Sequence, residues 1–390
     1  MDITEVSFHY PPRGWGGAER YAHQIGLGLS DAGHKVRVVT SSRSPTGKKK
    51  YTVQGLKVVA YPTAHKYPYS VVTRTWNPTA WLRNHGKGSV AHVHNVEGFS
   101  PLLFRSLKRG HQAVAWTAHD PTLMCGARML PRDGSSCSGI GSEKCGRCEN
   151  ALDKLRRRMV RRHLLPSVDA FIPPSKWMRG LMVAAGFPED KIYGIHNGIS
   201  LDGLERSPVP EEPVMMFCGQ MYPEKGLMFA LKAYQLVLEE IPDARFTIVG
   251  DGPQYEEALA YARKNELEGA FFTGRVSDPF PFYHRAKVVV HPSVIPENCS
   301  LVLLEAHAVG RPCVTTRVGG NAEIVHEGYT GLMTDSRQEG DLAYQLIQLL
   351  GSTKDARAMG RRARIRAERQ FRMSEKVADH ARLFKRLVEQ

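Results

Sequence analysis

No run of about 20 apolar residues occurs in the sequence, so no segment is long and apolar enough to cross a bilayer as a helix. The opening residues, MDITEVSFHY, lack the basic leader and the apolar core of a secretory signal. We therefore expect the chain in the cytoplasm, either free or on the inner face of the membrane.

Signatures of a helix-turn-helix, an RRM or a C2H2 finger are also missing, although the chain is strongly basic. It carries 53 Lys and Arg against 39 Asp and Glu, a formal net charge of +14. Basic residues cluster at 48–50, 156–162 and 361–366. Such clusters attract polyanions, and with no nucleic-acid motif we expect no nucleic-acid partner. Solvated helix faces and peripheral association with an anionic membrane surface stay open as explanations.

At 390 residues the chain exceeds the usual domain size of about 100–200 residues, which predicts two domains. Short β-branched runs alternate with helical stretches, a rhythm typical of parallel sheets covered by helices. We expect strands at 3–8, 35–40, 56–60, 90–93, 113–116, 170–172 and 192–195, then at 214–218, 245–249, 270–272, 288–291 and 312–315. We expect helices at 18–30, 225–239, 254–264 and 301–309, and a helical, proline-free stretch from 341 to 390.

We predict an α/β fold throughout the chain, divided into two Rossmann-like doubly wound domains. Its parts are an N-terminal domain at 1–200 with a cysteine-rich insert at 121–150, a proline-containing linker at 201–213, a C-terminal domain at 214–370, and a last helix at 371–390 that could cross back to the first domain. Ligands bind such sheets at the carboxyl ends of the strands. We therefore expect the site in a cleft between the two domains.

Two motifs that follow expected strands are suited to bind phosphate. Gly14-Trp15-Gly16-Gly17 opens the first helix, where glycines let the backbone approach a ligand and free N–H groups attract anions. It is not a GxGxxG fingerprint, so NAD gains little support, and a tight structural turn is the alternative. Lys225, in the turn at 219–226, offers a compact donor for a pyrophosphate, unless it is simply a solvated lysine.

Two further motifs carry polar groups at or near strand ends. His119 and Asp120 follow the strand at 113–116, where an imidazole can hydrogen-bond a sugar hydroxyl, or can simply be structural. Glu297 precedes a helix that Ser300 is placed to cap, and Glu305 lies inside that apolar helix. A carboxylate there needs a buried polar partner or an opening to a ligand. Vicinal ribose hydroxyls are one partner, and an ion pair with Arg311 is the alternative.

Together the motifs resemble glycosyltransferase family 4, the retaining enzymes with the GT-B fold. The segments that match, in family order, are GGAER, TAHD, HNGIS, the Gly-x₅-Lys-Gly turn, GDGP, HPS, PENCSLVLLEA and RVGGNAEIV. The Glu-x₇-Glu segment with its Leu-rich helix is the most specific of these. The resemblance covers nearly the whole chain.

The resemblance implies roles for individual residues. His119, Glu297 and Lys225 would act on the reacting sugar and the pyrophosphate, and Glu305 would bind the nucleotide ribose. The remaining donor contacts would come from Gly16, Gly17, Gln220, Arg275, Asn298, Cys299, Ser300 and Leu301.

Two departures from the family pattern affect these roles. The family usually has arginine where this chain has Gln220, which removes one positive charge that Arg275 would have to replace. The family often has Gly-Phe-Gly where this chain has Asn298-Cys299-Ser300. This second change reshapes the wall around the sugar.

By resemblance, the chain would transfer a hexosyl or N-acetylhexosaminyl group from a nucleotide sugar, and UDP is the nucleotide that the family leads us to expect. The acceptor would be a glycan, a lipid-linked or a small-molecule hydroxyl in surface polysaccharide or glycoconjugate synthesis. No catalytic metal is expected, because fixed cations serve the leaving group. The alternatives are glycosylation of a secondary metabolite such as an antibiotic aglycone, a non-catalytic binding protein on the same fold, and an epimerase.

Four of the seven cysteines fall in one segment with little apolar content of its own: Cys125, Cys137, Cys145 and Cys148. Their spacing contains one Cys-x₂-Cys pair. Four thiolates can fold such a segment around zinc, which we favour over free or disulfide-bonded thiols. An iron–sulfur cluster is the less supported choice.

Overall fold

A computed structural model describes residues 1–12, 16–42, 49–62, 88–95, 102–125, 151–335 and 338–390. The chain divides into two compact units. The first contains Met1–Gly198 together with Met373–Gln390, and the second contains Ile199–Arg372. The final helix is thus part of the first unit, the crossing that the sequence left open.

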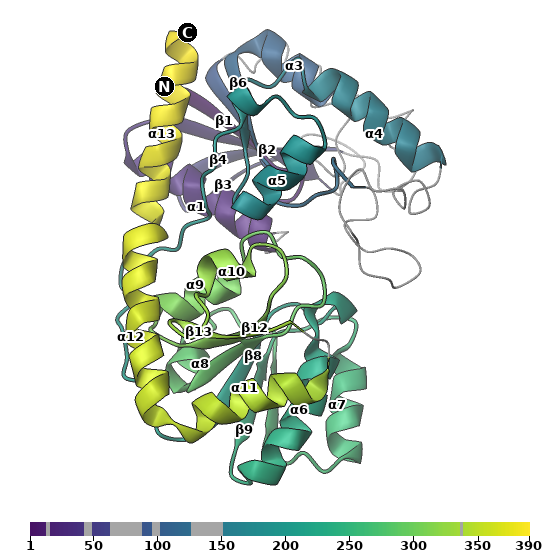
Figure 1. The fold of residues 1–390 in the computed structure, drawn as a ribbon. Helices are drawn as coiled ribbons and strands as arrows, with labels where there is room; N and C mark the ends of the chain where they lie inside the picture. Colours follow the sequence, from purple (N-terminus) through teal and green to yellow (C-terminus); the bar gives the residue numbers. More distant parts are fainter. Residues whose placement is uncertain (13–15, 43–48, 63–87, 96–101, 126–150, 336–337) are drawn as a thin grey trace. The chain divides into compact units, whose positions relative to one another are not determined.

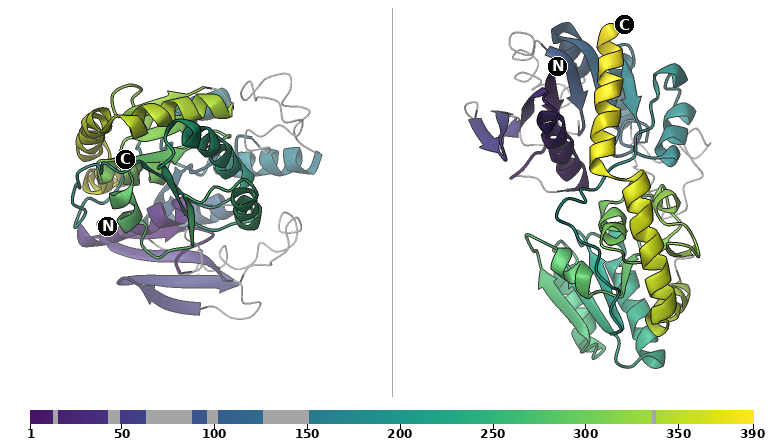
Figure 2. Two further views of the ribbon diagram at one scale, coloured as in Figure 1. Left: turned by 90° about the horizontal axis from the view of Figure 1, so that it is seen from below. Right: turned by 90° about the vertical axis from the view of Figure 1, so that its left-hand side faces the viewer.

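The described residues of the first unit form a seven-stranded sheet in the order β3-β4-β2-β1-β5-β6-β7 (Figure 1). Its strands are β1 (Asp2–Val6), β2 (Lys35–Ser42), β3 (Lys49–Val53), β4 (Leu56–Pro62), β5 (Gly88–Val93), β6 (His111–Thr117) and β7 (Ala170–Ile172). All neighbours pair in parallel except β3, which runs antiparallel to β4 at the outer edge (Figure 2).

Helices cover both faces of this sheet. They are α1 (Gly17–Asp31), α3 (Leu103–Gly110), α4 (Ala151–Leu164), α5 (Lys176–Ala184) and α13 (Met373–Glu389), with the short turn η3 (Glu189–Lys191). One face packs on α1 and α13 through Ile3, Tyr21 and Phe384, and Figure 1 shows these two helices side by side. The other face packs on α3 and α5. Helix α1 is followed by Gly33 at φ +85°, the left-handed conformation typical just past a helix end.

The second unit holds a six-stranded parallel sheet in the order β10-β9-β8-β11-β12-β13 among its described residues. Its strands are β8 (Val214–Cys218), β9 (Arg245–Val249), β10 (Ala270–Gly274), β11 (Val288–His291), β12 (Cys313–Thr316) and β13 (Gly331–Thr334). Its helices are η4 (Pro223–Lys225), α6 (Leu227–Glu240), α7 (Tyr255–Lys264), α8 (Phe280–Arg285), α9 (Leu301–Ala308), α10 (Asn321–Ile324), α11 (Glu339–Gly351) and α12 (Thr353–Gln370). Helices α6, α7 and α11 pack on one face, and α8 and α9 on the other.

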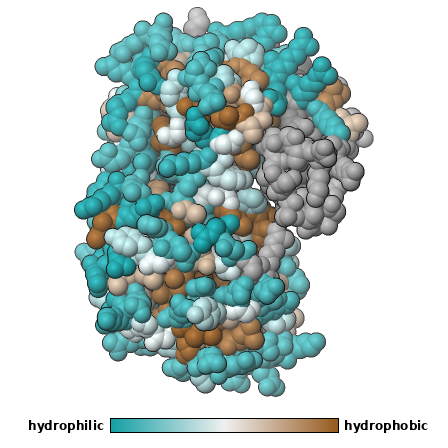
Figure 3. Space-filling view, in the orientation of Figure 1, coloured by the Kyte–Doolittle hydropathy of each residue, from teal (hydrophilic) through white to brown (hydrophobic). Residues whose placement is uncertain are grey.

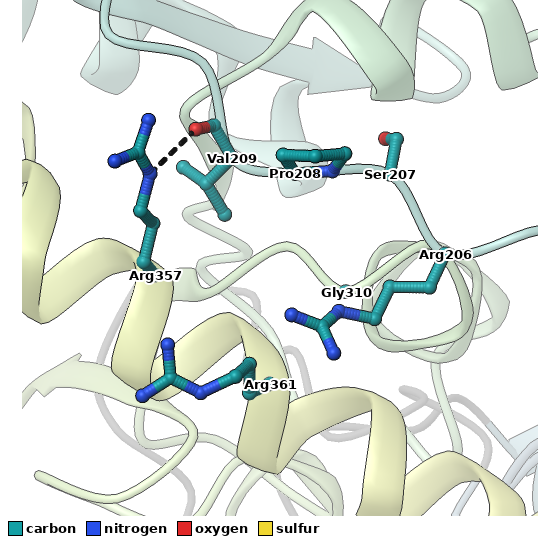
Figure 4. Close-up of a pocket in the computed structure, with 7 residues that line it drawn as sticks. All are labelled: Arg206, Ser207, Pro208, Val209, Gly310, Arg357 and Arg361. Atoms are coloured by element: carbon teal, nitrogen blue, oxygen red, sulfur yellow. Dashed lines mark hydrogen bonds between the residues drawn. The ribbon is translucent and has the colours of Figure 1, made fainter.

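The segment predicted as a linker, 201–213, lies against the second unit, where arginines bind its backbone. The buried Arg311 donates to the carbonyl oxygens of Ser207 at 2.9 Å and Pro208 at 3.2 Å. Arg357 donates to the Val209 carbonyl oxygen at 3.2 Å (Figure 4). The small cavity drawn in Figure 4 lies between these groups and Gly310, which precedes β12. It therefore lies at the amino ends of the strands.

The strand predictions agree with the structure except at three places. The segment 192–195 is not a strand, since it adds only an isolated bridge between Phe171 and Ile192. Strands β3 and β13 were not predicted. Helix α6 begins at Leu227, because the residues from Pro223 to Lys225 form the separate turn η4.

Polar side chains dominate the face shown in Figure 3, with apolar ones scattered among them. Among the described residues, the structure has no helix of the length and hydropathy needed to span a membrane.

Candidate active site

In each sheet the order of the strands changes direction at one point, and several of the predicted site residues follow the strands at that point. In the first sheet the reversal lies between β1 and β5, and in the second between β8 and β11. Loops that leave neighbouring strands in opposite directions open a crevice at the carboxyl edge, where ligands of such sheets bind. Gly16 and Gly17 follow β1, Lys225 follows β8, and Glu297 follows β11.

The turn after β8 is shaped by glycines. Gly226 has φ +74°, and a Cβ there would lie 2.1 Å from the carbonyl oxygen of Pro292. The loop after β11 also binds this turn, because the Val294 amide donates to the Glu224 carbonyl oxygen at 2.9 Å. Only glycine allows the two loops to approach so closely. The turn therefore fixes Lys225 next to the loop that carries Glu297.

Lys225 and Glu297 form an ion pair at this edge. Lys225 Nζ donates to Glu297 Oε1 at 2.6 Å, and Ser293 Oγ donates to the same oxygen at 2.8 Å. Burial tends to raise the pKa of Glu297, but Lys225 and His291 lower it below its ordinary value overall. Burial, aided by Lys225 and opposed by Glu297, lowers the pKa of His291 to about 4. Near pH 7 Glu297 is thus a carboxylate and His291 a neutral imidazole.

The backbone of Glu297 is held by the loop after β12. Gly319 forms a bridge with Glu297, and the Gly320 amide donates to the Glu297 carbonyl oxygen at 2.6 Å. At Gly319, where φ is +57°, a Cβ would lie 2.0 Å from that oxygen. Three loops therefore position one carboxylate.

Helix α9 begins at the same edge. Ser300 is its N-cap, and its hydroxyl accepts a hydrogen bond from the Leu303 amide. Asn298, Cys299 and Leu301 are buried beside it, each with at most 9% of its surface exposed. The predicted cap is confirmed.

Glu305 is buried within α9, with 1% of its surface exposed. The Tyr283 hydroxyl, from α8, donates to its Oε2 at 2.9 Å. Burial, with help from Cys218 and Glu305, raises the pKa of Tyr283 well above its ordinary value, so this hydroxyl remains a donor. Arg311 donates instead to backbone carbonyl oxygens, including that of Tyr283 at 3.0 Å. Tyr283 is therefore a partner of Glu305, and these contacts of Arg311 are not the ion pair considered from the sequence.

Gln220 and Arg275, which follow β8 and β10, both have exposed side chains. Strand β9 lies between β8 and β10. Strands are about 4.8 Å apart, so Arg275 leaves the sheet about 10 Å from the start of the Gln220 turn. The prediction that Arg275 replaces the positive charge lost at Gln220 therefore stays a prediction.

In the first unit, Gly16 is the N-cap of α1 and Gly17 is its first residue. Residues Gly14 and Trp15 of the same motif lie outside the described residues. The buried Glu19 accepts a hydrogen bond from Asn95 Nδ2 at 3.2 Å, which links α1 to the segment after β5. A Cβ on Gly16 would lie 2.4 Å from Glu19 Oε2. An acidic group therefore already lies close to this helix N-terminus.

His119 follows β6 and belongs to a buried chain of hydrogen bonds. Glu5 Oε2 lies 2.7 Å from His94 Nε2, and His94 Nδ1 lies 2.9 Å from His119 Nε2. Glu5 also contacts His92 Nδ1, at 3.1 Å, while His92 Nε2 lies 2.8 Å from Thr117 Oγ1. Glu5 pairs with His92 across β1 and β5, and the other members follow at alternate positions. All five side chains therefore lie on the sheet face that α1 and α13 cover.

Burial determines the charges in this group. Burial opposes ionisation of Glu5, but its histidine partners lower its pKa to about 2 overall. Burial and the neighbouring His92 lower the pKa of His94 to about 4, against the pull of Glu5. Burial and the other rings lower the pKa of His119 well below its ordinary value. His119 is therefore a neutral hydrogen-bonding group near pH 7.

The predicted metal site falls mostly outside the described residues, which include Cys125 but not Cys137, Cys145 or Cys148. Within the described part of the chain, donor atoms of Glu5, His92 and His94 lie within 4.8 Å of one another. Their donors and acceptors already satisfy one another in the hydrogen-bond chain. We treat this group as a proton-ordered network.

Glu5, His92, His94 and Tyr283 were not predicted as site residues from the sequence, and His291 stood there only within the HPS segment. A signal for the first three was present, because acid and imidazole groups interrupt strands that are otherwise apolar. A polar residue at an inward-facing strand position needs a buried partner. What the sequence lacked was the register that pairs Glu5 with His92.

Comparisons with known proteins agree with this architecture. A family model described as Glycosyltransferase Family 4 matches residues 15–202, and one described as Glycosyl transferases group 1 matches residues 212–352. The glycogen synthase of Mycobacterium tuberculosis is 28% identical over 391 residues, covering 95% of this chain and 91% of that protein. The N-acetyl-alpha-D-glucosaminyl L-malate synthase of Bacillus anthracis is 23% identical over 392 residues, with coverages of 95% and 93%.

Among solved structures, Anabaena Alr3699/HepE in complex with UDP and glucose superposes with a TM-score of 0.75. The identity is 16%, and the match covers 99% of both chains. Such a match shows a shared fold.

Proposed function

Because the chain belongs to glycosyltransferase family 4, we propose that it transfers a hexosyl or N-acetylhexosaminyl group from a nucleotide sugar to a hydroxyl acceptor, with retention of configuration. The chain is a glycosyltransferase with the GT-B fold. The donor, the acceptor and the residue roles are the proposal. The observation that carries it is the Lys225–Glu297 pair at the reversal point of the second sheet.

For the donor, we propose a uridine diphosphate sugar, since UDP and glucose are bound to the superposed Anabaena protein. Lys225 and the N-terminus of α9 would hold the diphosphate, because fixed positive groups at a helix start stabilise phosphate. Glu305 would accept from the ribose hydroxyls. Gly16 and Gly17 would let the backbone approach the donor, and His119 would contact the sugar.

The chemistry needs negative charge to be stabilised on the departing diphosphate. Lys225 supplies one fixed cation, and preorganised groups of this kind often make the largest catalytic contribution. The leaving phosphate oxygen would take the acceptor proton as the new glycosidic bond forms on the same face of the sugar. No metal is assigned to this step.

As acceptor we propose a glycan, a lipid-linked or a small-molecule hydroxyl in surface polysaccharide or glycoconjugate synthesis, with a secondary metabolite as the alternative. The surface around α4 favours an anionic setting, because Arg158, Arg161 and Arg162 line a shallow groove with Leu165 and Pro166. Basic groups beside apolar ones bind anionic membranes. Flotation with vesicles of anionic and of neutral lipids tests this, and equal binding to both would contradict it.

The donor test is a thermal-shift panel of nucleotide sugars on the full chain. A donor at 100 times its Kd stabilises the native state by about 2.7 kcal/mol, which raises Tm. Hits are then tested for transfer with Lys225→Ala and with Lys232→Ala as the matched control. Lys232 also forms an ion pair, with Glu339 on exposed surface.

We expect Lys225→Ala to lower kcat/KM at least tenfold, about 1.4 kcal/mol, and Lys232→Ala to leave it unchanged. Equal activity of both variants would remove Lys225 from the site. A panel in which no nucleotide sugar raises Tm would refute the proposed donor class.

A further inference from the structure

We propose that Glu5 and His94 are positioning residues that hold His119 in the tautomer with its proton on Nε2, so that Nδ1 accepts a hydrogen bond from a hydroxyl of the donor sugar. This inference rests on the proposed function for the role of the sugar. The tautomer itself can be measured without any donor.

The direction of every proton follows from the carboxylate at the start of the chain. Glu5 is fully buried and ionised, and a carboxylate only accepts hydrogen bonds. His94 must therefore donate to it from Nε2, 2.7 Å away. A neutral imidazole carries one proton, so Nδ1 of His94 is left as an acceptor.

The same logic passes to His119. Its Nε2 lies 2.9 Å from His94 Nδ1, and two acceptors cannot share a hydrogen bond. His119 must donate from Nε2, which places the lone pair on Nδ1. Burial keeps the pKa of His94 at about 4, so the ring stays neutral near pH 7 and its Nδ1 remains an acceptor.

The second branch of the network agrees with this order. His92 Nδ1 lies 3.1 Å from Glu5 and must also donate to it. His92 Nε2 then accepts from the Thr117 hydroxyl at 2.8 Å, which is free to act as the donor. One buried carboxylate thus orients both imidazoles. Because Thr117 lies off the line from Glu5 to His119, it provides a matched control.

The rings are also held in place by packing. His94 and His119 stack at 15° with their centroids 5.2 Å apart, and Tyr21 meets the His119 ring edge-on at 5.7 Å. His380, on α13, lies 5.2 Å from the His92 ring. A ring confined in this way cannot rotate to exchange its two nitrogens without disturbing α1 or α13.

The first measurement is long-range ¹H–¹⁵N correlation on protein with ¹⁵N-labelled histidine, with the His119 signals assigned by their loss in His119→Asn. For the wild type at pH 7 we expect a neutral His119 ring that is protonated on Nε2. A proton on Nδ1, or a doubly protonated ring, would overturn the proposal whatever the protein transfers.

The second measurement is transfer kinetics of Glu5→Gln, Glu5→Asp and Thr117→Val. The amide introduced by Glu5→Gln offers an NH₂ donor to His94 Nε2, which reverses both tautomers, and the same NMR measurement on this variant checks that His119 is then protonated on Nδ1. We expect kcat to fall at least tenfold in Glu5→Gln with the donor KM little changed, substantial recovery in Glu5→Asp, and wild-type kcat in Thr117→Val. If Glu5→Gln does not fold, His94→Gln takes its place.

These outcomes separate a positioning role from a structural one. Thr117→Val removes a buried hydrogen bond from the same cluster, so an equal fall of kcat in both variants would overturn the proposal. Unchanged kcat in Glu5→Gln, in a variant whose His119 proton is shown by NMR to have moved to Nδ1, would do the same. Absence of transfer by the wild type with every donor would count against the proposed function, while the NMR result would still decide the tautomer.

Discussion

Acidification should destabilise the first unit before the buried Glu5 takes up a proton. His94 and His380 are fully buried, and burial lowers the pKa of each from 6.5 to about 4. The unfolded chain therefore binds these protons first, so stability is full above pH 6.5 and falls as the pH drops toward 4. Each pKa unit is worth about 1.36 kcal/mol, so at pH 4.5 the two rings together lower the free energy of unfolding by about 5 kcal/mol.

Glu5 acts in a separate window. Its pKa is lowered to about 2, so the stability that it contributes is present above pH 4.5 and is lost only below that value. The range from pH 7 to 4.5 thus reports on the histidines. His92 and His119, whose pKa values are also lowered, act in the same direction as His94 and His380.

The assay is denaturant unfolding followed by tryptophan emission at pH 7.5, 6.5, 5.5 and 4.5. All five tryptophans lie within residues 1–198, so the emission reports on the first unit. His380→Leu should lose the part that this ring contributes, about 2.5 kcal/mol at pH 4.5, and His163→Gln, on the partly exposed end of α4, should keep the whole pH dependence. A loss smaller than about 1 kcal/mol between pH 7.5 and 4.5 would refute the reasoning.

Three further experiments test other parts of the protein. Gly226→Ala should lower the free energy of unfolding of the second unit by about 2–4 kcal/mol and also lower transfer, because it combines a left-handed φ with overlap on Pro292. Gly328→Ala, with a similar φ but open space, should lower it by about 1 kcal/mol, as measured by urea unfolding. Arg311→Met should cost about 3–5 kcal/mol by leaving the linker carbonyls unpaired, and Arg357→Met, half exposed, about 1 kcal/mol or less. Elemental analysis of the purified protein should find zinc, held by the four clustered cysteines; a protein free of zinc and iron would end that proposal.

The alternation of strands and helices could be predicted because parallel strands are buried on both faces and stand out as short apolar runs. The same reasoning explains the two missed strands. Strand β3 is an edge strand that begins with Lys49 and Lys50, so it lacks an apolar signal. Strand β13 starts at Gly331, where a side chain would collide with Cys313, and glycine is a residue that gives no strand signal. Strand edges follow from tertiary pairing, which a local pattern does not contain.

The candidate site divides along similar lines. Lys225, Ser300 and Glu297 could be located because each follows a strand or starts a helix, positions that local sequence marks. The partners of Glu305 and His119 could not, because they come from segments far away in the chain. Tyr283 is 22 residues from Glu305, and Glu5 is 89 residues from His94. Register, rather than composition, determines which polar groups meet.

The pairing of Lys225 with Glu297 also limits how this edge can bind a diphosphate. At 2.6 Å the carboxylate neutralises much of the lysine's charge, so an incoming phosphate meets a weaker cation than the sequence implied. An ammonium has three protons, however, and this ion pair occupies only one of them. A phosphate could therefore share Lys225 by approaching from the side away from Glu297. In the proposed function, Glu297 would thus set the direction of approach, and the strength of binding would depend on the α9 N-terminus.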